Sequence, residues 1–284
     1  MRATFLVVVL ATTLVATLAA SRAQAASNDV DLLGLVQSGV GDDAGFRALS
    51  RELGMVMTPT SLQPAETTGQ SGFDFGLDYT FHTVRLGESY WQNTLENPAT
   101  PVLMTLGARA RKGFVLPVPL TSEVELGVQW LIDSQLLSIG TNIRVALNEG
   151  FRFLPDVALQ VGVNRMVGHK DLDVTTVTAG GQVSKGFGVM GTFNLCPFVG
   201  YQSLWVNSSS RLLDTGADNA NNVDDNIVFT LVPLTANRLD RVSLGLRLLV
   251  AVVHITGGVD INFVDGITQT GALLQYSLRA GVAL

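Results

Sequence analysis

The sequence is poor in the residue types that build most catalytic and metal sites. Its 284 residues include one cysteine, Cys196, and three histidines, His82, His169 and His254. A single cysteine excludes an intrachain disulfide, and three dispersed histidines lack the spacing of a metal site. None of the histidines accompanies a recognisable nucleophile motif. We therefore predict no metal, no other cofactor and no enzymatic activity.

Charge is also scarce. Only 15% of the residues are charged, whereas 47% are hydrophobic and the mean hydropathy is +0.34. The formal net charge of -6 disfavours nucleic acid as a partner, because nucleic-acid binding needs a basic surface. So much apolar character with so few charges indicates a surface that faces something other than water.

Long hydrophobic runs are missing after the first 25 residues. Residues 1–25 have the pattern of a secretory signal peptide, with Arg2 before an apolar stretch at 5–18 and small residues at 23–25. We expect cleavage before Ala26. The alternative is an uncleaved anchor, but the apolar stretch is shorter than the roughly 20 residues that span a bilayer.

The apolar residues of the mature chain alternate with polar ones instead. In the first such block Phe73, Phe75 and Leu77 occupy one phase, and Asp74 and Asp78 occupy the other. A β-strand places the two phases on opposite faces. The pattern predicts ten strands, near residues 72–84, 101–111, 122–133, 136–148, 156–167, 171–185, 196–207, 239–250, 253–264 and 271–284.

The last of these strands reaches the C-terminus, with Tyr276, Leu278 and Leu284 in its apolar phase and Gly281 between them. This ending resembles the terminal strand of Gram-negative outer-membrane β-barrel proteins, although such strands commonly end in Phe. The resemblance implies an all-β transmembrane antiparallel up-and-down barrel at residues 71–284, in the bacterial outer membrane. It also implies contact with outer-membrane lipid and with the barrel-assembly machinery.

Two features of the topology stay open at this point. Residues 227–234 could form part of a further hairpin, which would raise the strand count from ten to twelve. Residues 26–70 do not alternate, and Asp42 or Asp43 could cap a short helix with Phe46, Leu49 and Leu53 on one stripe, ended by Gly54. We favour a helix at the periplasmic rim or against the wall over a plug inside the barrel.

If the aromatic phase faces lipid, the opposite phase faces the lumen. Its polar members carry charges of both signs, and a small barrel is narrow enough for such side chains to fill it. An open path is the alternative. The candidate lumen-lining residues are Asp74, Asp78, His82, Arg109, Arg111, Glu123, Glu125, Arg144, Arg247, Asp260 and Arg279, with Asn164 and Asn262 beside them.

The leading functional hypothesis is a passive channel or transporter for small solutes. The alternative is a closed structural or surface-interaction barrel, which acts through external loops such as the Asn- and Asp-rich residues 207–238. An outer-membrane hydrolase and a secreted barrel with an apolar ligand are weaker hypotheses. The secreted barrel needs the apolar phase turned inward, so the direction of that phase separates it from the membrane hypothesis.

Overall fold

The computed structural model describes residues 29–37, 40–95, 102–115, 120–189, 193–212, 228–264 and 271–284. The signal peptide prediction and residues 213–227 of the Asn- and Asp-rich loop lie outside these residues. Before the barrel come the 3-10 helix η1 (Leu32–Leu35), the short strands β1 (Val36–Gln37) and β2 (Val40–Gly41), and helix α2 (Asp43–Val56). No helix in the described part is long and apolar enough to cross a membrane.

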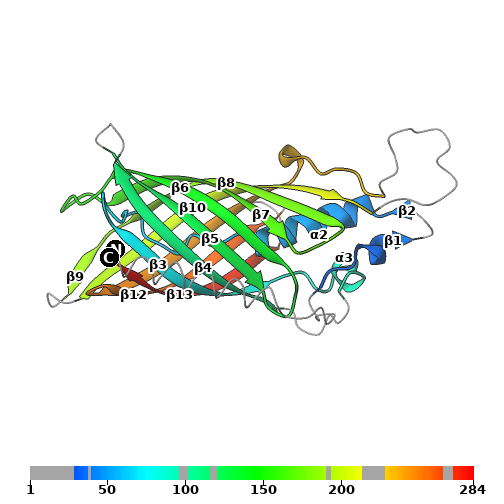
Figure 1. Cartoon of the computed structure of the whole chain (residues 1–284), viewed down its shortest axis with the longest axis horizontal. Coiled ribbons are helices and arrows are strands. Elements are labelled where there is room, and N and C mark those ends of the chain that lie inside the picture. The colour runs from blue at the N-terminus through cyan, green and yellow to red at the C-terminus, as the bar shows by residue number, and fades with distance from the viewer. Residues whose placement is uncertain are drawn as a thin grey trace, which may run out of the picture.

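Ten antiparallel strands form a closed barrel (Figure 1). Each strand of the ring pairs with the next ring strand along the chain, including β10 with β11. The pairing of the last strand, β13, with the first, β3, closes the ring. The strands are β3 (Phe73–Thr83), β4 (Val102–Val115), β5 (Thr121–Leu131), β6 (Leu137–Asn148), β7 (Asp156–Val167), β8 (Leu172–Ser184), β10 (Phe193–Ser210), β11 (Arg238–Val250), β12 (Val253–Phe263) and β13 (Ala272–Ala283).

The structure confirms ten strands and leaves no place in the ring for a further hairpin. The three-residue strand β9 (Phe187–Val189) pairs only with the start of β10. Within the described part of residues 227–234, Val232 forms an isolated bridge with Ser208, and the 3-10 helix η2 (Leu234–Ala236) follows.

The apolar phase of the strands points outward. Large apolar side chains are exposed on strands all round the ring, and on β5 Leu126 is 61% exposed. This direction excludes the secreted barrel, which needed the apolar phase inside. The exposed set includes Leu77, Phe81, Leu106, Ile139, Ile143, Leu159, Val161, Val199, Leu244, Leu246, Ile255, Tyr276 and Leu278.

The two ends of the barrel differ. The start of β3 and the C-terminus share one end, where Phe73 N–H donates to the Leu284 carbonyl over 2.8 Å. Connections there span residues 116–120, 149–155, 185–192 and 251–252, whereas connections at the other end include 84–101 and 211–237. Outer-membrane barrels have short periplasmic turns and longer extracellular loops. We call the C-terminal end the inner end and the opposite one the outer end.

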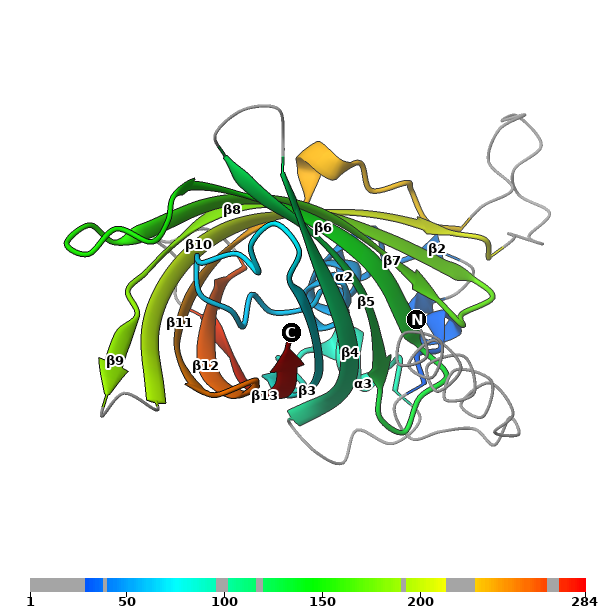
Figure 2. The same ribbon diagram turned by 60° about the vertical axis from the view of Figure 1, so that its left-hand side comes forward.

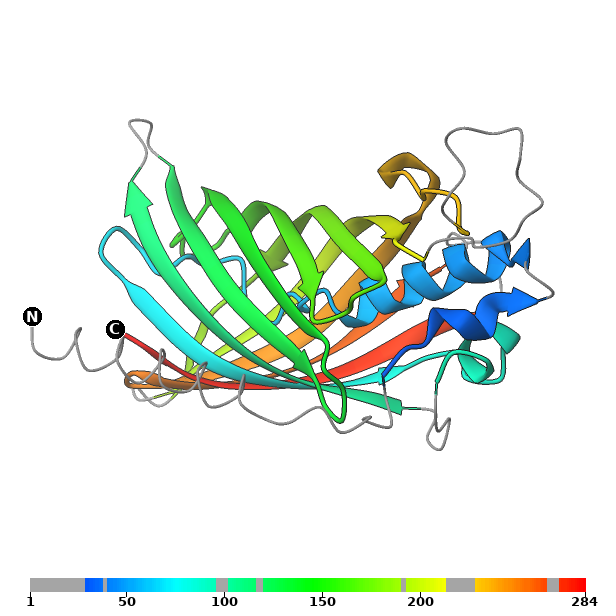
Figure 3. The same ribbon diagram turned by 45° about the vertical axis from the view of Figure 1, so that its right-hand side comes forward.

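Helix α2 lies within the outer end of the barrel (Figures 1 and 3). The chain then crosses the lumen to begin β3 at the inner end, and Figure 2 shows this blue segment inside the ring of strands. The helix is therefore not at the periplasmic rim; it packs against the wall, which is the other half of that prediction. The apolar stripe is buried as expected, but it is buried against the inside of the outer mouth.

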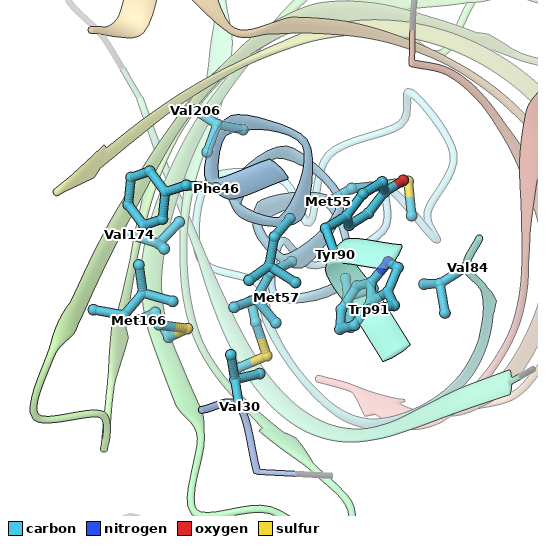
Figure 4. Close-up of a cluster of buried hydrophobic side chains, with 14 of the residues drawn as sticks. Val30, Phe46, Met55, Met57, Val84, Tyr90, Trp91, Met166, Val174 and Val206 are labelled. Carbon is cyan, nitrogen blue, oxygen red and sulfur yellow. The ribbon is translucent and has the colours of Figure 1, made fainter. Parts of the chain in front are cut away.

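The sequence of α2 explains its start and its packing. The Asp42 carboxylate accepts a hydrogen bond from Gly45 N–H over 2.9 Å, and the stripe of Phe46, Leu49 and Leu53 is fully buried. Phe46 joins a cluster with Val206 of β10 and with Tyr90 and Trp91 of α3 (Ser89–Gln92) (Figure 4).

Gly54 does not end the helix, which continues to Val56. A Cβ at Gly54 would approach Val206 Cγ1 to 2.7 Å, so the glycine instead lets the helix pack closely against β10. Our prediction that the helix ends at Gly54 is wrong for this reason: a glycine near a helix end serves close packing as well as termination.

Leu126→Arg is expected to lower the free energy of unfolding by about 2–4 kcal/mol, because it places a charge midway along a lipid-facing strand. Urea titration of the protein in lipid vesicles measures this change. Phe153→Arg is the control, since Phe153 is 88% exposed in an inner-end turn and its replacement should have almost no effect. Equal effects at both sites would contradict the lipid-facing assignment of Leu126.

Candidate functional site

The lumen holds a buried network of charged side chains from adjacent strands. Arg109 of β4 pairs with Asp78 of β3 and reaches Glu125 Oε1 of β5 at 3.6 Å. Arg111, one pleat nearer the inner end, lies 3.1 Å from Asp74 Oδ2 and 3.2 Å from Glu123 Oε1. The alternation of each strand explains why these side chains all point inward.

Two further arginines extend the network on either side. Arg279 of β13 lies 2.6 Å from Asp74 Oδ1, and Arg144 of β6 lies 3.4 Å from Glu123 Oε1. His254 of β12 contacts the other Asp74 oxygen at 2.7 Å. Gly76 makes room for this arrangement, because a Cβ there would approach Arg279 Nε to 2.5 Å.

The network balances its charges. It contains four guanidinium groups, from Arg109, Arg111, Arg144 and Arg279, and four carboxylates, from Asp74, Asp78, Glu123 and Glu125. All eight side chains are buried. Removal of one member of a buried ion-pair network leaves a charge without its counterion, which is costly. The arrangement therefore cross-links neighbouring strands and presents no excess of either charge to a passing ion.

A second polar layer holds the end of helix α2. Gln129 Nε2 donates to the Val56 carbonyl over 2.8 Å, while Arg241 and Gln275 donate to the Met55 carbonyl over 3.2 and 3.3 Å. These donors satisfy carbonyl groups that the last turn of a helix leaves without partners. The barrel wall thus caps the helix that lies inside it.

The extended chain after the helix is also hydrogen-bonded to the wall. Arg109 donates to the Thr60 carbonyl over 2.7 Å, and Arg144 donates to the Pro64 carbonyl over 2.8 Å. Ser61 accepts hydrogen bonds from Gln160 and Gln182 over 2.9 and 2.8 Å. Residues 43–68 therefore fill the lumen, and we call them the plug.

The plug packs closely against the wall at Gly258 and leaves a small polar cavity beside residues 58–61. A polar cavity of about 30 Å³ lies between residues 58–61 and the wall, where Arg109, Asn142 and Gln202 are among its lining residues. That volume holds one or two water molecules. Gly258 shows how tight the fit is, because a Cβ there would approach Leu62 Cδ2 to 2.7 Å.

At the outer mouth, the buried carboxylate of Glu52 joins the plug to the β3–β4 connection. It accepts hydrogen bonds from Tyr90 Oη over 2.9 Å, from Trp91 Nε1 over 2.7 Å and from Arg85 N–H over 3.2 Å. Burial raises the pKa of Tyr90, and the charge of Glu52 raises it further. Trp91 is fully buried, so its side chain packs inside the outer mouth.

The structure places all but one of the eleven candidate lumen residues among the buried residues. His82 Nε2 lies 2.8 Å from Thr105 Oγ1, and Asp260 accepts a hydrogen bond from Ser243. The exception is Arg247, which pairs with Glu66 of the plug and keeps part of its side chain exposed. The eight residues of the balanced network are the ones that the structure brings together.

Sequence reasoning missed several residues that hold the plug. Arg241 shares the inward phase of β11 with Arg247, so the alternation around Val242 was sufficient to find it. Gln160 and Gln182 also occupy inward phases, but a neutral amide is a weaker sequence signal for a lumen contact than a charged side chain. Glu52 gave a weaker signal, because a carboxylate next to an apolar helical stripe is normally solvent-exposed.

The histidines do not converge on one site. His82 lies among Thr105 and Gln275, His254 contacts Asp74, and His169 Nε2 lies 2.6 Å from the Val30 carbonyl at the outer end. Among the residues that the structure describes, no three His, Cys, Asp or Glu side chains are grouped as metal ligands would be.

A closed antiparallel ring with an apolar exterior and an ionic interior satisfies every requirement for strands that span a bilayer, because no backbone edge faces lipid. The protein is an outer-membrane β-barrel. This β-barrel protein contains its own plug, and the apolar belt of the ring places it in the bacterial outer membrane.

Comparison with known proteins gives likeness of fold alone. No family model matches the sequence, and no curated protein matches it significantly. Among solved structures, the translocator domain of the autotransporter NalP from Neisseria meningitidis is 11% identical, with 85% of this chain and 97% of that chain covered and a TM-score of 0.41. Neisserial surface protein A is 11% identical, with 75% and 95% covered and a TM-score of 0.30. The COG4313 outer membrane channel from Pseudomonas putida F1 is 9% identical, with 80% and 99% covered and a TM-score of 0.33.

Asp74→Asn is expected to lower the free energy of unfolding by about 3–5 kcal/mol, because Arg111 and Arg279 lose the carboxylate that they share. Urea titration in lipid vesicles measures the loss. Asp173→Asn is the matched control, since Asp173 also joins two arginines, Arg165 and Arg211, but both are exposed. The control should lose less than about 1 kcal/mol, and a similarly small loss at Asp74 would contradict the network's structural role.

Glu52→Gln is expected to loosen the outer mouth, because charge-assisted hydrogen bonds to Tyr90 and Trp91 are lost. Such bonds contribute about 1.5–3 kcal/mol each, so amide hydrogen exchange in residues 86–95 should accelerate at least about tenfold. Glu88→Gln in the same connection is the control, because Glu88 is exposed and makes no capping hydrogen bond. Unchanged exchange in Glu52→Gln would show that Glu52 does not hold this connection.

Proposed function

We propose that this outer-membrane barrel is closed and works through its outer face, as a surface-interaction or structural protein. The observation that carries the proposal is the plug, which occupies the lumen from the outer mouth to the inner end. An open channel for solutes needs a continuous water-filled path. The cavity of about 30 Å³ beside residues 58–61 is too small to be part of one.

The chemistry of the lumen supports a closed barrel as well. Channel walls that select ions carry an excess of one charge or rings of oriented dipoles. Here four guanidinium groups face four carboxylates, and two of the arginines, Arg109 and Arg144, also donate to plug carbonyls. These groups are used to hold the plug and the wall together.

A passive channel for small solutes is the second candidate, and it requires the plug to move. One feature of the plug favours it. After Met57 in the sequence, the described plug contacts the wall largely through hydrogen bonds with wall side chains, such as those made by Ser61, Pro64 and Thr68. Water can replace such bonds with a modest net cost in free energy. The apolar cluster around Phe46 and Leu49 at the outer mouth opposes the movement.

We further propose that the protein has no catalytic role. Each described histidine has a partner that orients it within the fold: His82 contacts Thr105, His254 contacts Asp74 and His169 contacts the Val30 carbonyl. Its proposed partners are outer-membrane lipid and the barrel-assembly machinery. Small solutes are proposed partners only under the channel hypothesis.

Planar-bilayer recording of the purified protein tests the closed barrel. We expect no conductance steps from the natural protein, because the plug fills the lumen. A variant without residues 29–68 should give stable steps, because a ring of ten strands without its filling leaves a water-filled path.

Heat-dependent migration in electrophoresis is the control that both proteins have a folded barrel. Stable steps from the natural protein would contradict the closed barrel and support the channel. A folded but silent deletion variant would show that the plug is not what closes the lumen.

A further inference from the structure

The chain upstream of β3 passes through the barrel in one direction, from the outer end to the inner end. Strand β5 runs from Thr121 at the inner end to Leu131 at the outer end, so the β5 residue that a plug residue lies beside gives its depth in the barrel. Val56 bonds to Gln129, and Thr60 bonds to Arg109, which is opposite Gly127. Thr68 N–H donates to Glu123 over 3.1 Å. As residue numbers rise, the plug approaches the inner end.

The residues before the plug are anchored to the outer end by three different connections. Asp29 Oδ1 accepts hydrogen bonds from Ser134 Oγ and Gln135 N–H, over 2.9 and 2.8 Å, in the β5–β6 connection. The Val30 carbonyl lies 2.6 Å from His169 of the β7–β8 connection. Val30 also forms a bridge with Leu95 of the β3–β4 connection. Asp29 is therefore at the opposite end of the barrel from the C-terminus.

We infer that residues 29–35 lie at the cell surface, so that the described chain enters the barrel from outside the cell and runs through the lumen to the periplasmic end. Outer-membrane barrels usually have both termini in the periplasm. Here the first strand begins and the last strand ends at the inner end, as that rule requires. Residues 29–35 nevertheless lie at the outer end, because the plug that follows them crosses the lumen.

Cysteine labelling of intact cells tests this topology. The natural Cys196 is buried and is replaced by serine in every variant. Leu33→Cys reports on η1, where Leu33 is 60% exposed. Lys170→Cys in the exposed β7–β8 connection marks the outer end, and Arg152→Cys in the exposed β6–β7 turn marks the inner end. The reagent is a maleimide attached to a polymer too large to cross the outer membrane.

We expect Leu33→Cys and Lys170→Cys to be labelled to a similar extent in intact cells, and Arg152→Cys to be labelled only after the outer membrane is broken. Labelling of Lys170→Cys without Leu33→Cys would overturn the passage of the chain through the lumen. Labelling of Arg152→Cys alone would reverse the barrel and overturn the surface location. Heat-dependent migration confirms that each variant is folded before it is scored.

Discussion

The interior of the barrel depends on buried charges that are matched in number and held at fixed positions. A ring of ten strands encloses more space than short side chains can fill, and charged groups inside it are stable only with counterions and hydrogen-bond partners. Arg109 and Arg144 show how the two requirements are met together. Each contacts a carboxylate of the network and also donates to a carbonyl of the plug. The plug supplies carbonyl acceptors to these two arginines of the wall, and plug N–H groups such as that of Thr68 donate to the wall in turn.

Much of this architecture follows from the sequence, because strands in a membrane barrel alternate with a strict period of two. That period places Asp74, Asp78, Arg109 and Glu125 on one face of the sheet, which the membrane hypothesis turns inward, and it predicts all ten strands with nearly correct bounds. The same period cannot say whether the inward residues surround water or protein. Residues 57–68 decide whether the lumen holds protein or water. Because this extended segment has no periodic pattern, the sequence does not reveal that it crosses the lumen, and it favours a helix at the rim or against the wall over a plug.

The position of α2 was harder to predict than its existence. An amphipathic stripe shows that one face is buried, and Asp42 marks where the helix begins. Neither feature says which end of the barrel the helix occupies. That information is in tertiary contacts such as Gly54 with Val206 and Glu52 with Trp91. These contacts join the N-terminal segment to the outer mouth and give this barrel a topology in which its first and last described residues lie at opposite ends.

The central claim is that the plug fills the lumen, and a disulfide across the interface tests it most directly. Thr60 Oγ1 lies 3.2 Å from Ser277 Oγ of β13. With Cys196 replaced by serine, Thr60→Cys and Ser277→Cys together should form a disulfide in the membrane under mild oxidation, seen as a mobility change that reductant reverses. Thr60→Cys with Lys170→Cys, at the outer end, should not. Failure of the first pair to cross-link in a folded barrel would contradict the account.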